Sequence, residues 1–243
     1  MRLLWSGLLL CLSTTLSSAE LTALRVAIPD YPPYTVLAQG EFSGPGYDAF
    51  ISIMTEAGLQ YQLIPVPNFG RALIDMQNKQ IDMFFLATEN AERSHVAQFS
   101  LPVITTDWSW VWLKARKDVA PGSEQFRQDA LVSAQMNSNI FSWLQQHKYK
   151  ITAGTNNIHG LFKLLDFNRV DAIMLPSDVA TALIAKQQLD ASRYNMQQEL
   201  TLPFGFYVSN NYLSLQPDFL QRLNAAISRY HDNAARAEPA PNQ

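Results

Sequence analysis

The chain has almost no means of cross-linking itself. Of its 243 residues only one is a cysteine, Cys11, and it lies close to the N-terminus. The rest of the chain therefore has neither a thiol nor a disulfide, and its fold must be held by burial of a core. A chain of this length can bury such a core as one large domain or as two smaller ones.

An excess of charge of one sign is also missing. The 18 Lys and Arg residues and 21 Asp and Glu residues leave a formal net charge of −3 at pH 7. No cluster of Lys and Arg marks a face for nucleic acid or anionic lipid. After the N-terminal leader, no second apolar run is long enough for a membrane helix. We therefore expect neither a nucleic-acid partner nor a further membrane segment.

The motifs of the common enzyme classes are missing as well. There is no nucleophile elbow, HExxH motif or P-loop, and Gly44-Pro45-Gly46 lacks the third glycine of a dinucleotide site. The histidines are scattered and do not have the spacing of metal ligands; they are His95, His147, His159 and His231. We predict no catalytic residue, no metal and no cofactor, and we expect a protein that is not an enzyme.

The two ends of the chain have distinctive compositions. Arg2, the apolar run 3–12 and the small residues Ser17-Ser18-Ala19 are the three parts of a secretory signal. They predict a signal peptide at 1–19 and a mature chain that begins at Glu20. An N-terminal anchor helix is the alternative, but the run is too short to cross a bilayer comfortably. At the other end, 234–243 is small, polar and Pro-containing, and we predict a disordered tail.

Strand and helix patterns alternate along the mature chain. They predict a first α/β unit and then a second one of similar size. Asp48 is a candidate N-cap for the first helix, and Gly58 is its stop. The predicted strands are 24–28, 61–66, 81–85, 130–134, 151–153 and 170–174, and the predicted helices are 48–58, 71–78, 140–146, 158–167 and 179–187.

Two further strands and a final helix complete the pattern. In 107–113 three tryptophans alternate with other residues, so they share one face of a strand, and a buried strand face is the plain interpretation. Part of this stripe could also flank a hinge. Another strand is predicted at 204–208, and an amphipathic helix at 218–231.

Three stretches carry a resemblance to a known family. Gly46-Tyr47-Asp48 resembles the Gly-Phe-Asp motif of family 3 solute-binding proteins, the extracytoplasmic receptors of polar amino-acid ABC transporters. That family's longest signature is resembled by three segments in order: the Asp82 strand, the Thr-x-x-x-x-Arg segment 88–93 and Phe99-Ser100-Leu101-Pro102. Arg169-Val170-Asp171-Ala172 is similar to its Gly-Arg-x-Asp-Ala motif. The order and spacing match from about residue 24 to 232.

The resemblance implies an α/β, two-lobed periplasmic binding protein type II fold with a hinge of two crossing strands. Lobe 1 would comprise 20–112 and 205–233, and lobe 2 would comprise 113–204. A ligand would lie in the cleft, and the lobes would close on it about the hinge. The implied protein is a periplasmic monomer that works with an ABC permease in the inner membrane or acts as a sensor.

The resemblance also implies ligand-binding residues in the family's longest signature and in a loop of lobe 2. Arg93 matches the arginine that grips a ligand carboxylate, and a guanidinium fork is well suited to bind one. A surface arginine at a helix start is the alternative. Thr88 matches a hydroxyl donor in the same loop. In lobe 2, 135–139 resembles a Gln-x-Gly-Thr-Thr loop, so Ser138 and Asn139 would form an anion site at a helix N-terminus.

Aromatic positions are implied on the lobe 1 side of the cleft. Phe69 and Arg71 lie in a segment that resembles Trp-x-Arg-Ala in one branch of the family, so Phe69 could stack on the ligand. Arg71 could face the cleft or be a solvated helix residue. Tyr31 and Tyr34 match aromatic loop positions of lobe 1, with core packing as the alternative.

One position departs from the family pattern. The family aspartate that takes the ammonium of an amino acid falls on Pro176, which has neither a carboxylate nor an N–H. Asp178 is a substitute ligand contact, although we favour a role as the cap of the next helix. The expected ligand is therefore small and anionic or amino-acid-like: an acid without a standard α-ammonium, or an amine bound by other groups. The alternative function is a periplasmic dehydratase-like enzyme acting on a cyclic carboxylate, which would need a general acid in the cleft.

Overall fold

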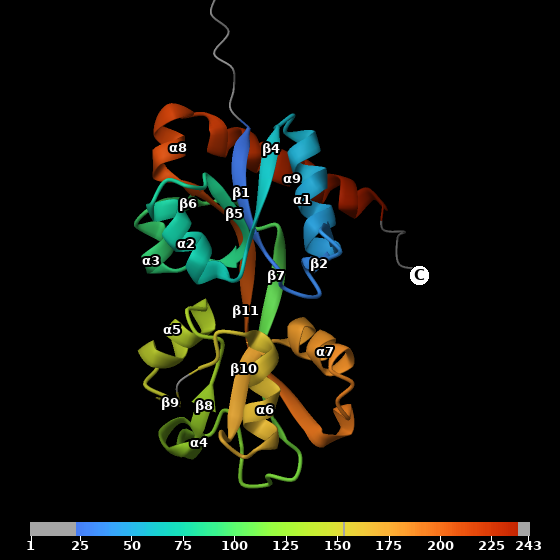
Figure 1. Cartoon of the computed structure of the whole chain (residues 1–243), viewed down its shortest axis with the longest axis vertical. Coiled ribbons are helices and arrows are strands. Elements are labelled where there is room, and N and C mark those ends of the chain that lie inside the picture. Colours follow the sequence, from blue (N-terminus) through green and yellow to red (C-terminus); the bar gives the residue numbers. More distant parts are fainter. Residues whose placement is uncertain (1–22, 153, 238–243) are drawn as a thin grey trace, which may run out of the picture.

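The computed structural model describes residues 23–152 and 154–237. The helices and strands form two groups stacked along the long axis, an upper and a lower lobe, and two long strands run between them (Figure 1). The class is α/β, as the alternating patterns predicted. The predicted signal peptide at 1–19 lies outside the described residues.

The upper lobe is built around a parallel sheet in the order β4-β1-β5. The central strands are largely apolar, and β5 is buried along its whole length, as strands with both faces covered are. The elements of this lobe are β1 (Leu24–Pro29), β2 (Val36–Ala38), β3 (Glu41–Ser43), α1 (Pro45–Glu56), β4 (Tyr61–Val66), α2 (Phe69–Gln77), β5 (Met83–Thr88), α3 (Ala91–Ser94), β6 (Ala97–Phe99), α8 (Asn210–Leu215) and α9 (Phe219–Ala237).

The lower lobe repeats this plan on a smaller scale. Its parallel strands follow the order β10-β8-β9, and helices lie on either side of them (Figure 1). Its elements are α4 (Glu124–Asp129), β8 (Leu131–Ser133), α5 (Asn139–Gln146), β9 (Lys150–Ile151), the 3-10 turn Ile158–Gly160, α6 (Leu161–Asp166), β10 (Ala172–Pro176), α7 (Ser177–Lys186) and the 3-10 turn Ala191–Arg193.

The connecting strands are β7 (Ile104–Leu113) and β11 (Tyr194–Ser209), which pair antiparallel with each other. β7 also pairs with β10 of the lower lobe, and β11 pairs with β5 and β6 of the upper lobe. The two lobe sheets are therefore continuous through these strands. β11 begins well before the predicted strand 204–208. The prediction missed its first half because that half is polar and lacks an apolar alternation.

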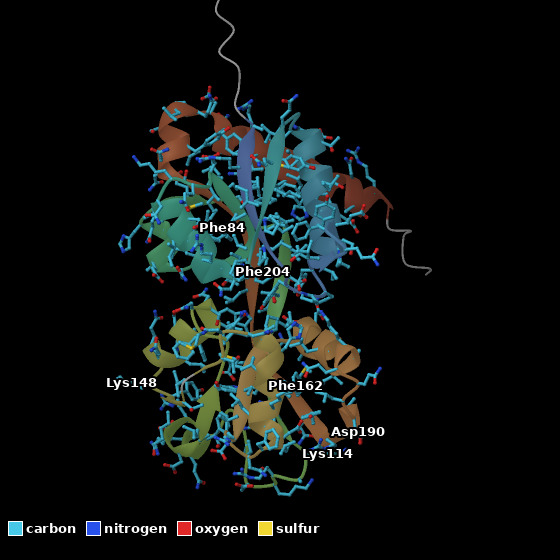
Figure 2. All side chains as sticks on the ribbon, viewed as in Figure 1. Phe84, Lys114, Lys148, Phe162, Asp190 and Phe204 are labelled. Atoms are coloured by element: carbon cyan, nitrogen blue, oxygen red, sulfur yellow. The ribbon has the colours of Figure 1, made fainter. Side chains whose placement is uncertain are left out.

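Aromatic side chains lie in the cores of both lobes. Phe84 lies in the upper lobe, Phe162 in the lower lobe and Phe204 on a connecting strand between them, whereas Lys114 and Lys148 lie at the outer surface (Figure 2). The predicted tryptophan face is confirmed, since all three indoles of β7 are buried in one cluster of the lower lobe; they are Trp108, Trp110 and Trp112.

The aspartates of two signature motifs have structural roles. Asp82 Oδ2 accepts from the backbone N–H of Arg25 at 2.9 Å, and its Oδ1 lies 2.6 Å from the Arg25 guanidinium, which ties β5 to β1. Asp171 Oδ2 accepts from Leu131 N–H at 2.8 Å, and its Oδ1 accepts from Arg116 at 2.8 Å, which ties β10 to β8. Both carboxylates therefore fix strand neighbours in their own lobe.

The starts of α1 and α2 differ from the predictions for identifiable reasons. The N-cap of α1 is Gly44 rather than Asp48. Glycine suits this position because a Cβ would lie 2.5 Å from Pro33 O and because its φ of 107° favours glycine. α2 begins at Phe69 rather than Arg71, because the side chain of Asn68 accepts from Arg71 N–H at 2.9 Å and caps the helix.

The C-terminal helix is longer than predicted. α9 continues to Ala237, so 234–237 is helical where a disordered tail was expected. Alanine and arginine are strong helix formers, and this outweighs the loss of packing at an exposed end. The remainder of the predicted tail lies outside the described residues. Among the described helices, none combines the length and the apolar character needed to cross a bilayer.

Candidate functional site

Arg93 is held in place by a short helix at the edge of the upper lobe. Asn90 caps α3, and its side chain accepts from Arg93 N–H at 2.9 Å. The Arg93 side chain turns inward, since the residue is only 3% exposed. Its Nη1 donates to the backbone oxygen of Thr88 at 2.7 Å. The alternative of a surface arginine at a helix start is therefore wrong.

The surroundings of the Arg93 guanidinium are aromatic. Its Cζ lies 5.5 Å from the ring centroid of Phe69, 5.8 Å from that of Phe84 and 5.9 Å from that of Tyr207. Burial lowers the pKa of Arg93 to about 10. Within the described ranges no carboxylate forms an ion pair with Arg93, although other arginines and a lysine do have acidic partners. A buried cation in these surroundings is suited to bind an anion.

A small cavity of about 30 Å³ lies beside Arg93, where the two lobes meet. Both lobes and both connecting strands contribute to its wall. Six of the nine residues predicted to bind a ligand line it, namely Tyr31, Phe69, Thr88, Arg93, Ser138 and Asn139. The other lining residues are Ala87, Trp108, Ile140 and Phe204.

A larger cavity of about 500 Å³ opens between α2, α3 and α5. Phe69, Arg93 and Ser138 line both cavities, so the two are adjacent. Arg71 and Glu92 are the other charged residues of its wall. A ligand with its acidic group at Arg93 could extend into this larger space.

Arg71 is placed differently from Arg93. Its side chain is 55% exposed, and its Nε lies 2.9 Å from Oδ1 of the buried Asp75 one turn along α2. The pair is ionic but does not have the geometry of a hydrogen bond, and Asp75 Oδ1 accepts none from the described residues. Arg71 is thus the counter-ion of Asp75, and it also reaches the wall of the larger cavity.

The start of α5 faces the segment that carries Arg93. Ser138 is the N-cap, and its Oγ accepts from Phe141 N–H at 3.1 Å. Asn139 Nδ2 donates to Thr88 Oγ1 at 2.5 Å and to Glu89 O at 3.0 Å. Its Oδ1 accepts from Asn90 Nδ2 at 3.2 Å. The Asn139 amide, predicted to bind a ligand, is therefore engaged by the upper lobe.

Asn137 precedes this helix in a left-handed backbone conformation, with φ of 59°. The matching family position is a glycine, and asparagine is the residue that best tolerates this conformation after glycine. The substitution is therefore compatible with the loop geometry that the resemblance implied.

The two predicted tyrosines have separate positions. Tyr31 lines the small cavity with its ring edge-on to Phe69, at a centroid distance of 5.4 Å, and burial raises the pKa of its phenol. Tyr34 is buried beside it and lines neither cavity. The Tyr34 hydroxyl instead donates to Asp178 Oδ2 at 3.1 Å, across the boundary between the lobes.

The favoured expectation for Asp178 is wrong. It does not cap α7, because Pro176 occupies the N-cap position and no side chain makes a capping bond there. Asp178 lies in the first turn, where a carboxylate is favourable near the helix N-terminus. It lines neither cavity. The structure therefore does not bring Asp178 to the cavities, where seven of the nine predicted residues are found.

Sequence reasoning missed several residues of the site. Trp108 and Phe204 line the small cavity from the connecting strands, whereas sequence patterns place both only in strands. Asn90 was overlooked although it is the residue before a helix and three before Arg93, which is the signal of a cap. Within the described residues, no group of three or more His, Cys, Asp or Glu side chains is placed to hold a metal ion.

Comparisons with known proteins identify a family from the sequence and the fold from solved structures. The sequence profile of the bacterial extracellular solute-binding proteins, family 3, matches residues 24–238. No curated protein sequence matches the chain. Solved structures share the fold at low sequence identity.

The ligand-binding core of GluR0 from Nostoc punctiforme, in complex with L-glutamate, has a TM-score of 0.72 and 19% identity over 87% of this chain and 94% of its own. The ancestral amino acid-binding protein AncCDT-1, described as a precursor of cyclohexadienyl dehydratase, has a TM-score of 0.70 and 20% identity over 87% of this chain and 91% of its own. A histidine kinase sensor domain with similarity to periplasmic binding proteins has a TM-score of 0.76 and 14% identity over 88% of this chain and 92% of its own.

Proposed function

Because the chain belongs to the bacterial extracellular solute-binding proteins of family 3 and has the two-lobed type II periplasmic binding protein fold, we propose that it binds a small anionic molecule between its lobes. Arg93 binds the acidic group of this molecule, and the lobes close on it about β7 and β11. We propose that the upper lobe is lobe 1, with the predicted bounds 20–112 and 205–233, and that the lower lobe is lobe 2, with the bounds 113–204; residues 20–22 lie outside the described part of the chain.

The observation that carries this proposal is the burial of Arg93 without an acidic partner among the described residues. Taking a guanidinium out of water is costly unless it is paired and hydrogen-bonded. One backbone oxygen, that of Thr88, offsets only part of this cost. A carboxylate that accepts two parallel hydrogen bonds from the guanidinium fork supplies the missing partner.

The ligand class follows from the charges near the site. Pro176 stands where the family aspartate binds an α-ammonium, and the nearby carboxylate of Asp178 accepts from Tyr34 instead. An unpaired ammonium would be costly in a closed cleft. We therefore favour an acid without an α-ammonium over a free α-amino acid. The GluR0 structure, by contrast, holds a free α-amino acid, L-glutamate.

The biological setting is also part of the proposal. The composition of 1–19 supports export to the periplasm with removal of the signal peptide. There the protein would act as a monomer that delivers its ligand to an ABC permease or reports it to a membrane sensor. The likeness of its fold to a histidine kinase sensor domain makes the second role a natural one.

One observation favours an enzymatic alternative. Glu92 lines the larger cavity next to Arg93, so a carboxyl group is close enough to the site to be considered as a general acid. The fold is also that of an ancestral protein described as a precursor of a cyclohexadienyl dehydratase. Dehydration of a cyclic carboxylate such as prephenate, lost in Glu92→Gln, would establish this function in place of simple binding.

A ligand screen tests the proposal. Thermal unfolding is followed with matched pairs of compounds, each an α-amino acid and the same acid without its amino group. A ligand at about a hundredfold excess over its Kd adds roughly 2.7 kcal/mol, which should raise the midpoint by about 5–10 °C. We expect shifts only with the acids. Shifts only with neutral or cationic compounds would contradict the proposal.

A further inference from the structure

The lobes are joined directly by side chains on both sides of the proposed site, and we propose that Asn139 is a latch that holds them closed. The latch would couple closure to Arg93, and in this respect it rests on the proposed function. The closed arrangement would be populated by the protein alone, because these contacts need nothing between them.

Both the nitrogen and the oxygen of the Asn139 side-chain amide form hydrogen bonds. Its side chain donates to Thr88 Oγ1 and to Glu89 O, and it accepts from Asn90 Nδ2. All three partners belong to the upper lobe, whereas Asn139 begins α5 of the lower lobe. One side chain thereby satisfies polar groups of three consecutive residues across the lobe boundary, and opening would break all three bonds together.

Asn139 forms its hydrogen bonds with residues 88–90, and this same segment positions Arg93. The backbone oxygen of Thr88 accepts from Arg93 Nη1 at 2.7 Å, and the side chain of Asn90 accepts from Arg93 N–H at 2.9 Å. Any displacement of Arg93 on binding an anion is therefore transmitted to two of the three partners of Asn139. This shared segment is the physical basis for coupling between the ligand and the latch.

A second contact joins the lobes on the opposite side. The Tyr34 hydroxyl donates to Asp178 Oδ2 at 3.1 Å, and Tyr34 is buried in the upper lobe. A close approach accompanies the first contact, because a Cβ on Gly70 of α2 would lie 2.7 Å from Asn137 Cβ. Glycine at position 70 therefore lets α2 approach the loop before α5 closely enough for the latch to form.

The latch has a measurable consequence for affinity. When only the closed state binds tightly, the apparent dissociation constant equals the intrinsic constant divided by the closed fraction. Loss of the latch should therefore weaken binding although Arg93 is unchanged, and Tyr34→Phe separates this effect from any direct contact of Asn139 with the ligand, because Tyr34 lines neither cavity. We expect Asn139→Ala to weaken the affinity for the best acid by about tenfold.

Small-angle X-ray scattering of the protein without ligand tests the latch directly. We expect the wild type to fit the closed arrangement, and Asn139→Ala and Tyr34→Phe to have larger radii of gyration. The matched control is Gln146→Ala, an exposed residue of the same helix, which should scatter like the wild type. Circular dichroism and thermal unfolding confirm that each variant is folded.

Equal scattering curves for the wild type, Asn139→Ala and Tyr34→Phe would overturn the proposal, as would a wild type that is fully open. Gly70→Ala gives a second, independent test, since its added methyl group should open the lobes while every hydrogen-bonding side chain is kept. The scattering arm needs no ligand. A failed ligand screen with a working latch would thus count against the proposed function alone.

Discussion

Arg93 Nη1 donates to the backbone oxygen of Thr88 at 2.7 Å, a bond between the two ends of one signature segment. It turns the guanidinium away from solvent and towards the rings of Phe69, Phe84 and Tyr207. The segment therefore folds back on itself to present a cation at the lobe boundary.

Arg93→Met should separate binding from stability. The change removes a desolvated cation and keeps an apolar chain of similar length among the aromatic rings, so the unfolding midpoint should stay the same or rise. Binding of an anionic ligand should fall by about a hundredfold, because the carboxylate loses its partner. Calorimetry and thermal unfolding measure the two effects, with the exposed Arg236→Met as the control. Unchanged affinity would show that Arg93 does not hold the acidic group.

Pro176→Asp should create affinity for α-amino acids. The residue is the N-cap of α7, a position that favours aspartate, but it is buried, so circular dichroism first checks that the variant is folded. It restores a carboxylate where the family pattern has one, and an α-ammonium could then be paired. Calorimetry with common L-amino acids should show binding at least about tenfold tighter than in the wild type. Pro176→Asn is the neutral control. Tight binding of an amino acid by the wild type, lost in Asp178→Asn, would contradict this reasoning.

The stability of the protein should depend on pH through His159. Burial, with a contribution from Lys186, lowers the pKa of this imidazole, and Asp30 acts in the opposite sense. Below about pH 6.5 the unfolded chain binds a proton at His159 that the folded protein does not. The free energy of unfolding should therefore fall as the pH drops from about 6.5 towards the lowered pKa.

His159→Gln should remove this part of the pH dependence. Urea unfolding at a series of pH values between about 5 and 7.5 spans the ordinary pKa of histidine. The variant should lose less stability on acidification than the wild type, with the exposed His95→Gln as the control. Parallel curves for the wild type and His159→Gln would count against the shift.

Trp110→Phe should destabilise the lower lobe. Trp110 is fully buried, and its Nε1 donates to Glu199 Oε2 at 2.9 Å. The smaller ring leaves a cavity and an unpaired carboxylate, so the free energy of unfolding should fall by about 2 kcal/mol. Equilibrium urea unfolding measures this loss. The partly exposed Trp143→Phe is the control, and an equal effect of the two changes would contradict the interpretation.

Much of the fold could be predicted from local patterns. The strand at 61–66 has the predicted bounds, and the alternating tryptophans of β7 are buried on one face. These features follow from residue spacing, which is read within a few neighbours. Helix starts were less accurate, as at α2, because the cap at Asn68 depends on a loop conformation that spacing does not specify.

The α/β elements, their order and the motif that contains Arg93 could be predicted from the sequence, because burial patterns and short motifs are local. The contacts between these distant residues could not. Asn139 contacts residues about fifty positions away, and Asp178 accepts from Tyr34, which lies 144 positions earlier in the chain. Such pairs depend on how the two lobes are placed against each other, and no periodicity within either segment encodes that placement.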